Sequence, residues 1–260
     1  MALKDALTKI AAISIALYVI FGLILFSSQR SMIYYPDRQD FFDCPFFDDH
    51  QIREYNGTRF YYLESSADEV IIYYHGNAGS ACDRGTLRPF FENFGWSVIF
   101  AEYAGYSDDK RRPSKELIFE DVRNINSFVD QRYGRVTIYG QSIGSGAASY
   151  HAAIGDVDTL ILVAPFSSLK DVAQSKIKIY PVSLLLTENY DNIRALEDYE
   201  GRVIIFHGDA DHVIPYRFSL QLFEKIEAQQ KEYFLIEGKG HNDIWESAYF
   251  RDELAKSLVR

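Results

Sequence analysis

A serine set between two glycines is the first residue of this chain that could carry out chemistry. The sequence G-Q-S-I-G occupies residues 140–144, with Ser142 at its centre. Residues 135–139 form an apolar run typical of a short buried strand, and residues 145–153 are small enough to form a helix packed closely on a sheet. A strand, a sharp turn and a helix are the context of a nucleophile elbow. Because this pattern alone is a weak signal, the rest of the chain must supply a base and an acid.

The base that activates a serine hydroxyl is usually a histidine oriented by a carboxylate. His241 follows the last expected strand, residues 233–236, and lies in a glycine-containing loop that can return to Ser142. His207 stands at the end of a buried strand, and we interpret it as a structural histidine whose ring bonds to nearby backbone. His151 lies on the helix after the serine and faces the wrong end. We therefore predict His241 as the base.

Two neighbouring aspartates are candidates for the acid. Asp209 and Asp211 both follow the strand expected at residues 203–206. Asp209 is better explained as a residue that stabilises its own turn. Asp211 lies farther along the loop, where its carboxylate can reach a histidine on the next loop. In a fold with a nucleophile elbow, the three residues follow along the chain in the order serine, acid, histidine. Asp243 adjoins His241 and is interpreted as a favourable charge in the first turn of a final helix that Asn242 caps.

Hydrolysis of an acyl group also needs N–H donors for the developing oxyanion. The backbone N–H of Ile143, directly after the serine and at the start of a helix, is one candidate. The second donor is expected in the turn H-G-N-A-G at residues 75–79, at Asn77 or, as second choice, at Ala78.

The elements that must position these residues alternate between strand and helix from residue 70 to the end of the chain. This rhythm predicts βαβ units and a mostly parallel, doubly wound sheet, whose ligands bind at the carboxyl ends of the strands. Asn56-Gly57 between two alternating arms predicts a hairpin. The expected helices are residues 80–94, a helix from its cap at Ser114 to about residue 132, and residues 216–229.

Composition limits the classes of partner. The 260 residues fit one domain, and the net charge of −10 without a basic cluster argues against nucleic acid. Cys44 and Cys82 lack metal-ligand spacing and are interpreted as structural thiols, although a disulfide between them stays open. We expect no nucleotide, flavin or metal cofactor.

An uncharged apolar run at residues 10–26 predicts a membrane anchor at residues 1–28, followed by one domain at residues 29–260. A cleaved signal peptide and a buried core helix are the alternatives. The first lacks a good cleavage site, and the second leaves no polar face for solvent.

The flanking charges predict the orientation of this single-pass segment. Lys4, Lys9 and the amino terminus slightly outweigh Arg30 and Arg38, which favours a cytoplasmic N-terminus and an extracytoplasmic domain. The tyrosines of residues 32–36 could form an aromatic belt at the membrane interface.

Four segments of the chain resemble the α/β-hydrolase superfamily and, within it, the small membrane-anchored serine hydrolases of the Bem46 type. They are H-G-N-A-G at 75–79, G-Q-S-I-G-S-G at 140–146, H-G-D-A-D-H-V-I-P at 207–215 and G-K-G-H-N at 238–242. Residues 29–36 and 102–107 favour the subgroup, although Ser107 stands where a glycine is usual. The resemblance covers about residues 29–258 and is more specific for the superfamily than for the subgroup.

This resemblance implies both a fold and a set of roles. The fold is α/β, an eight-stranded, mostly parallel sheet with flanking helices and a small cap. Ser142 is the nucleophile, Asp211 the acid and His241 the base, while Asn77 and Ile143 are the oxyanion donors.

The expected function is that of a serine hydrolase of the carboxylic-ester class, working through an acyl-enzyme intermediate. The substrate is expected to be a small-molecule or lipid-like acyl ester or thioester, because the anchor holds the site near a bilayer. A serine peptidase on the same fold and a catalytically silent membrane-bound scaffold are the alternatives.

The region where large caps enter this fold, residues 165–200, is short, so the site should be open. Within it L-L-L at residues 184–186 could line an acyl pocket or belong to the core, and we favour the core.

Overall fold

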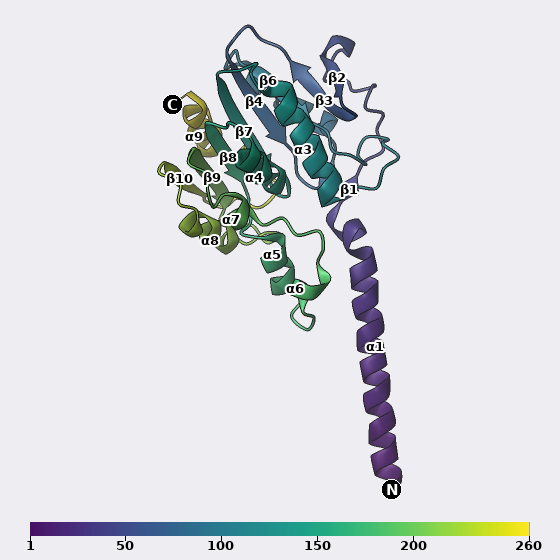
Figure 1. Ribbon diagram of the computed structural model, residues 1–260. Helices are drawn as coiled ribbons and strands as arrows, with labels where there is room; N and C mark the ends of the chain where they lie inside the picture. Colours follow the sequence, from purple (N-terminus) through teal and green to yellow (C-terminus); the bar gives the residue numbers. More distant parts are fainter. Residues whose placement is uncertain (260) are drawn as a thin grey trace.

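The computed structural model describes residues 1–259, which form one sheet domain and a long helix that projects from it (Figure 1). The strands are β1 (Tyr35–Pro36), β2 (Ile52–Tyr55), β3 (Thr58–Leu63), β4 (Glu69–Tyr74), β5 (Ala78–Gly79), β6 (Ser97–Ala101), β7 (Arg135–Gln141), β8 (Thr159–Val163), β9 (Arg202–Gly208) and β10 (Lys231–Ile236).

Helices connect most of these strands. The α-helices are α1 (Ala2–Ile33), α2 (Arg88–Glu92), α3 (Lys115–Val129), α4 (Gly144–Ile154), α5 (Leu169–Lys176), α6 (Val182–Leu185), α7 (Asn192–Ala195), α8 (Arg217–Lys225) and α9 (Ala248–Val259). The 3-10 helices are η1 (Asp49–Gln51), η2 (Cys82–Leu87) and η3 (Ile244–Glu246).

The main sheet has eight strands in the order β10-β9-β8-β7-β4-β6-β3-β2. β3 pairs antiparallel with β2 and β6, and the neighbours from β6 to β10 are parallel. The prediction of an eight-stranded, mostly parallel sheet is confirmed. Because these strands run in one direction, the turns after β4, β7, β9 and β10 lie at the same edge of the sheet.

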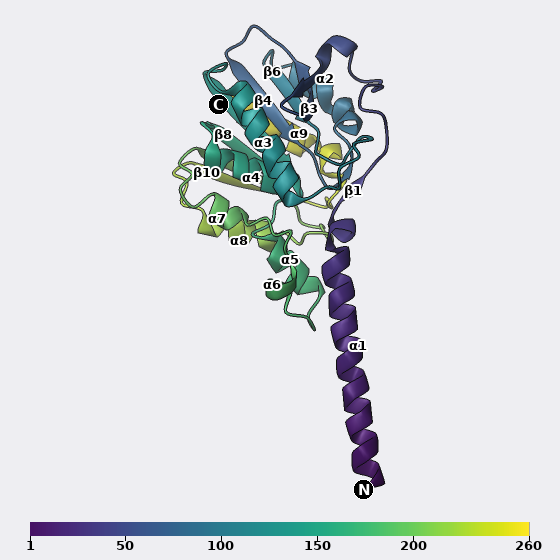
Figure 2. The same cartoon turned by 45° about the vertical axis from the view of Figure 1, so that its right-hand side comes forward.

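Alternating side chains of the strands build an apolar core on each face of the sheet. In β4, Val70, Ile72 and Tyr74 belong to one core, and Ile71 and Tyr73 belong to the other. Helices α3, α4 and α8 cover the first face, and α2 and α9 cover the second (Figure 2). Burial on both faces explains why the central strands are continuously apolar in the sequence.

Several local predictions are confirmed. Asn56 and Gly57 have φ angles of 50° and 80° and join β2 to β3, as a two-residue hairpin requires. The side chain of Ser114 caps α3, since its Oγ accepts a hydrogen bond from the N–H of Leu117 at 3.3 Å.

Two predicted helices differ in the structure. Residues 80–94 form the 3-10 helix η2 and the short α2 instead of one helix. The change from η2 to α2 lies between Leu87 and Arg88, with Pro89 in the first turn of α2. Asn242 does not cap the last α-helix, because η3 intervenes and α9 starts at Ala248. Asp243, at the N-cap of η3, accepts a 2.6 Å hydrogen bond from the N–H of Gly240.

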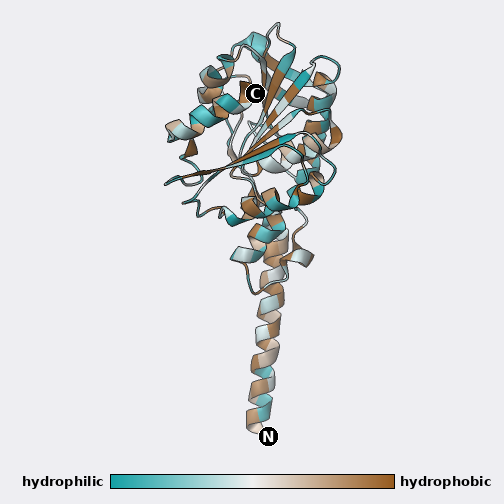
Figure 3. Cartoon of the chain, turned by 90° about the vertical axis from the view of Figure 1, so that its left-hand side faces the viewer, coloured by the Kyte–Doolittle hydropathy of each residue, from teal (hydrophilic) through white to brown (hydrophobic). Residues whose placement is uncertain are grey.

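Helix α1 lies almost entirely outside the domain and is predominantly hydrophobic along its length (Figure 3). Gly22 is its one buried residue, which excludes the alternative of a core helix. By its length and composition α1 could span a membrane. Membrane anchors and signal sequences both have this length and composition.

The cap between β8 and β9 is small and consists of α5, α6 and α7. Its Leu184 is 79% exposed, so the interpretation of this leucine as a core residue is wrong. The aromatic-belt interpretation is wrong for Tyr34, which is buried and whose hydroxyl donates a 2.8 Å hydrogen bond to Glu188 of the cap.

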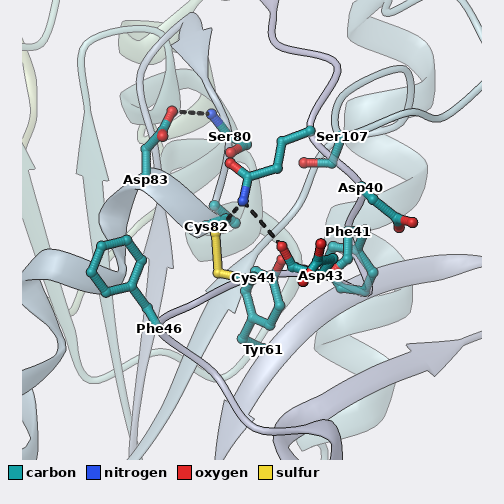
Figure 4. The surroundings of a disulfide bond; sticks show 12 residues. Asp40, Phe41, Asp43, Cys44, Phe46, Tyr61, Ser80, Cys82, Asp83 and Ser107 are labelled. Atoms are coloured by element: carbon teal, nitrogen blue, oxygen red, sulfur yellow. Dashed lines mark hydrogen bonds between the residues drawn. A yellow bond between two sulfur atoms is a disulfide. The ribbon is translucent and has the colours of Figure 1, made fainter.

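Cys44 and Cys82 form a disulfide, so their interpretation as thiols is wrong. The bond joins the loop before η1 to the start of η2 (Figure 4). It lies beside Tyr61 in the core that α2 and α9 cover.

Candidate functional site

Ser142 occupies a strained turn between β7 and α4. Its φ of 55° lies in the left-handed region, where a non-glycine residue is uncommon. A Cβ at Gly140 would lie 2.5 Å from Cβ of Ala148, and one at Gly144 would lie 2.3 Å from the carbonyl oxygen of Tyr74. The two glycines are therefore needed for the strand and the helix to approach each other at this turn.

The structure brings Ser142, His241 and Asp211 together from three loops. Nε2 of His241 lies 2.9 Å from Oγ of Ser142, and Nδ1 of His241 lies 2.7 Å from Oδ2 of Asp211. Asp211 comes from the turn after β9, and His241 from the loop after β10. Because β9 and β10 are parallel neighbours, both loops start at the edge of the sheet where Ser142 lies.

The carboxylate of Asp211 is held in its ionised form. Burial alone would raise its pKa, but hydrogen bonds from His207 and His241 and from the backbone N–H of Ile214 outweigh burial and hold the pKa below its usual range. A depressed pKa contributes stability above the unfolded pKa that is lost as the pH falls. The carboxylate of Asp211 is therefore a negatively charged partner for His241 at neutral pH.

The other candidates have structural partners. Nε2 of His207 lies 2.8 Å from the carbonyl oxygen of Ile214, as its interpretation as a structural histidine predicts, and also 3.2 Å from Oδ2 of Asp211. Sequence reasoning missed this second contact, although the spacing of four residues could have indicated it. Oδ1 of Asp209 accepts a 2.7 Å hydrogen bond from the N–H of Gly238, so this aspartate ties together two loops rather than its own turn.

His151 is buried away from the site. Its Nδ1 lies 2.8 Å from the hydroxyl of Tyr74, and its Nε2 lies 3.1 Å from Oδ1 of Asn126. Burial lowers its pKa to about 3, so it is neutral at physiological pH.

A cavity of about 290 Å³ opens beside Ser142 and His241. Asn77 and Ala78 line one side, and Gln141 lies next to the serine. The sequence analysis missed five further lining residues, which come from three separate segments: Tyr73, Arg84, Thr86, Leu87 and Trp245. No local motif marks them, since only the fold brings them to this cavity.

The turn at residues 75–79 lies against Ser142. A Cβ at Gly76 would lie 3.6 Å from Cβ of Ser142. Within residues 1–259 neither the N–H of Asn77 nor that of Ile143 donates a hydrogen bond to another protein group. Both donors predicted for the oxyanion are therefore unengaged.

The same turn is fastened to the end of α1. Nδ2 of Asn77 donates a 2.9 Å hydrogen bond to the carbonyl oxygen of Ile33, and its own carbonyl oxygen accepts from the N–H of Tyr35 at 2.9 Å and the hydroxyl of Tyr106 at 2.8 Å. The two-residue strands β1 and β5 then pair in parallel. The segment after the apolar helix thus holds the turn beside Ser142 in place.

We expect Asn77→Ala to lower kcat for ester hydrolysis by about tenfold, because a small displacement of the turn misplaces its N–H groups. Steady-state kinetics should give a nearly unchanged KM. Asn124→Ala is the matched control, since the Asn124 amide also donates to a backbone carbonyl, that of Asn56, and neither residue lines the cavity. Equal losses in the two variants would contradict a positioning role for Asn77.

Proteins similar to this chain in sequence include hydrolase-domain proteins and uncharacterised proteins. The chain is 31% identical over 187 residues to an alpha/beta hydrolase domain-containing protein 17B of Xenopus laevis, covering 69% of this chain and 62% of that protein. It is 27% identical over 246 residues to an uncharacterised protein of Mycobacterium tuberculosis, covering 89% of this chain and 87% of the relative. None of the known family models matches this chain.

Solved structures share the fold. An esterase of Pyrococcus furiosus superimposes with a TM-score of 0.67 at 13% identity, covering 88% of this chain and 97% of the esterase. The parallel sheet, the serine turn after β7 and the hydrolase-domain relatives agree on one assignment. The chain belongs to the α/β-hydrolase superfamily.

Proposed function

We propose that this protein is a membrane-anchored serine hydrolase that cleaves carboxylic esters or thioesters. The observation that carries the proposal is the chain of hydrogen bonds from Ser142 through His241 to Asp211, at 2.9 Å and 2.7 Å. A hydroxyl, an imidazole and a carboxylate in this order form the arrangement that activates a serine for acyl transfer.

In the first step Oγ of Ser142 attacks the acyl carbon while Nε2 of His241 takes the hydroxyl proton. The N–H groups of Asn77 and Ile143 stabilise the oxyanion of the tetrahedral intermediate. His241 then gives its proton to the leaving alcohol or thiol, and an acyl ester on Ser142 remains. Water, deprotonated by His241, attacks this ester, and collapse of the second intermediate returns the proton to Ser142 and releases the acid.

The substrate we propose is a lipid-like ester, because α1 would hold the cavity close to a bilayer. The small cap between β8 and β9 leaves the site open to long chains. The Pyrococcus furiosus esterase, which shares the fold, supports ester chemistry. The quoted segments at 29–36 and 102–107 support placement among the Bem46-type hydrolases.

The domain, we propose, lies on the extracytoplasmic side of a single-pass anchor. The disulfide between Cys44 and Cys82 supports this side, because disulfides persist in oxidising compartments and are rare in the reducing cytosol. The lysines before the apolar run favour the same orientation.

Hydrolysis of a panel of p-nitrophenyl esters of increasing chain length tests the proposal. We expect release of nitrophenol by the detergent-solubilised full chain and loss of at least about 10³-fold in Ser142→Ala. A folded wild-type protein that cleaves no ester, or a variant as active as the wild type, would refute it.

A further inference from the structure

We propose that the cap segment of residues 177–187 inserts into the lipid bilayer beside α1 and is a second membrane contact of the protein. The inference goes beyond the hydrolytic function and rests on the proposed role of α1 as an anchor. Its partner is the acyl-chain region of the bilayer.

The cap segment packs against the middle of the apolar helix rather than against its end. The rings of Tyr180 and Tyr18 stack with centroids 4.4 Å apart, and Phe21 contacts the same ring at 5.7 Å. A Cβ at Gly22 would lie 3.0 Å from Cε1 of Tyr180, so this glycine admits the ring. In Figures 1 and 2 the cap around α6 accordingly descends beside α1.

Reciprocal hydrogen bonds fix this depth. The hydroxyl of Tyr18 donates to the carbonyl oxygen of Ile179, and the hydroxyl of Tyr180 donates to the carbonyl oxygen of Tyr18, both at 2.8 Å. Tyr18 lies eight residues before Phe26, where the apolar run ends, and at 1.5 Å per residue this is about 12 Å. If α1 spans the bilayer, the tip of the cap lies at the depth of its acyl chains.

Two exposed side chains of the cap segment are large and apolar, which favours a lipid environment. Ile179 is 72% exposed, and Leu184 is 79% exposed. Lys178 is the only charged residue from 177 to 187, and its long stem can carry the ammonium group toward the headgroups. An exposed apolar segment that continues the surface of an apolar helix supports a contact with the membrane.

Backbone carbonyl groups of the cap segment are hydrogen-bonded within the protein. This matters in an apolar medium, where an unpaired carbonyl group is costly. The side chain of Gln174 donates to the carbonyl oxygens of Ile177 at 3.0 Å and Tyr180 at 3.1 Å, and its oxygen accepts from the N–H of Val182 at 3.1 Å. Together with the Tyr18 hydroxyl on Ile179, these bonds satisfy the carbonyl groups of Ile177, Ile179 and Tyr180.

An apolar cavity of about 280 Å³ lies between α1 and the cap. Leu25 and Ile33 of α1 line one side, and Val172, Leu185 and Leu186 line the other. Leu25 lies near the end of the apolar run and Ile33 lies beyond it, so this hollow lies on the domain side of the contact at Tyr18.

Depth-dependent quenching of single fluorescent probes tests the insertion. Cys44 and Cys82 are paired, so an introduced cysteine is the one free thiol of the described chain. The full-length protein carrying Leu184→Cys or Ile179→Cys is labelled with a nitrobenzoxadiazole probe and reconstituted in phosphatidylcholine vesicles containing acyl-chain nitroxide lipids. Leu17→Cys on α1 is the membrane control, and Tyr249→Cys on α9 is the solvent control, both at exposed positions.

We expect blue-shifted emission and strong nitroxide quenching at positions 184 and 179, as at position 17, and little quenching at position 249. If the probe at position 17 is quenched but the probes at positions 179 and 184 are as little quenched as the probe at position 249, the insertion is overturned and the anchor is not. Absence of quenching at position 17 as well would overturn both. Neither the emission wavelength nor the quenching depends on hydrolysis, so these results are independent of whether the catalytic proposal is correct.

Discussion

His241→Ala should lower kcat for ester hydrolysis by at least about 10³-fold with a small change in KM. Nε2 of His241 lies 2.9 Å from Oγ of Ser142, and no other imidazole described for this chain lies within hydrogen-bond distance of that hydroxyl. Without the base the serine proton has no acceptor in the transition state, whereas the cavity that binds the substrate is retained. Steady-state kinetics on a p-nitrophenyl ester measure the effect.

His212→Ala is the matched control for this variant. His212 is exposed and follows Asp211 directly in the chain, but its only hydrogen bond among the described residues is made by its backbone carbonyl, which accepts from Nζ of Lys176. Its kcat should stay within about twofold of the wild type, as is usual for surface substitutions. Losses of similar size in the two variants would contradict the assignment of His241 as the base.

Loss of the disulfide should destabilise the domain by about 4 kcal/mol and lower the Tm by about 10 °C. The bond closes a loop with a sequence separation of 38 residues, and its removal enlarges the conformational freedom of the unfolded chain. Thermal unfolding of the double variant Cys44→Ala, Cys82→Ala, followed by circular dichroism, measures the change.

Two comparisons isolate the covalent bond. Wild-type protein in excess dithiothreitol should melt close to the double variant, while dithiothreitol should leave the Tm of the double variant unchanged. A double variant that melts within about 2 °C of the oxidised wild type would show that the bond adds little to stability.

The sheet and the turn that holds Ser142 could be predicted because local sequence determines them. The run of β-branched and aromatic residues in β4 is apolar on both faces, and such a strand belongs in a covered parallel sheet. Gly140 and Gly144 mark the turn at Ser142 because larger residues would not fit there. Parallel strand order then brings Asp211 and His241 to the same edge.

What could not be predicted depends on contacts between distant segments. The spacing of Cys44 and Cys82 does not indicate a bond, because their proximity depends on how the loop before η1 folds across the sheet. The leucines at 184–186 have the composition of a core, but the cap is too small to cover Leu184. Likewise the pairing of Tyr34 with Glu188 joins residues 154 positions apart, and Tyr34 by itself resembles an interface residue.

Reaction with a fluorophosphonate probe shows whether Ser142 is a nucleophile activated by its neighbours. The purified full-length protein is treated with the probe, digested and mapped by mass spectrometry, beside Ser142→Ala and heat-denatured wild type. We expect one adduct, on Ser142, in the native wild type and none in either control. A native protein without an adduct on Ser142, or one whose labelling survives Ser142→Ala, would contradict this role of Ser142.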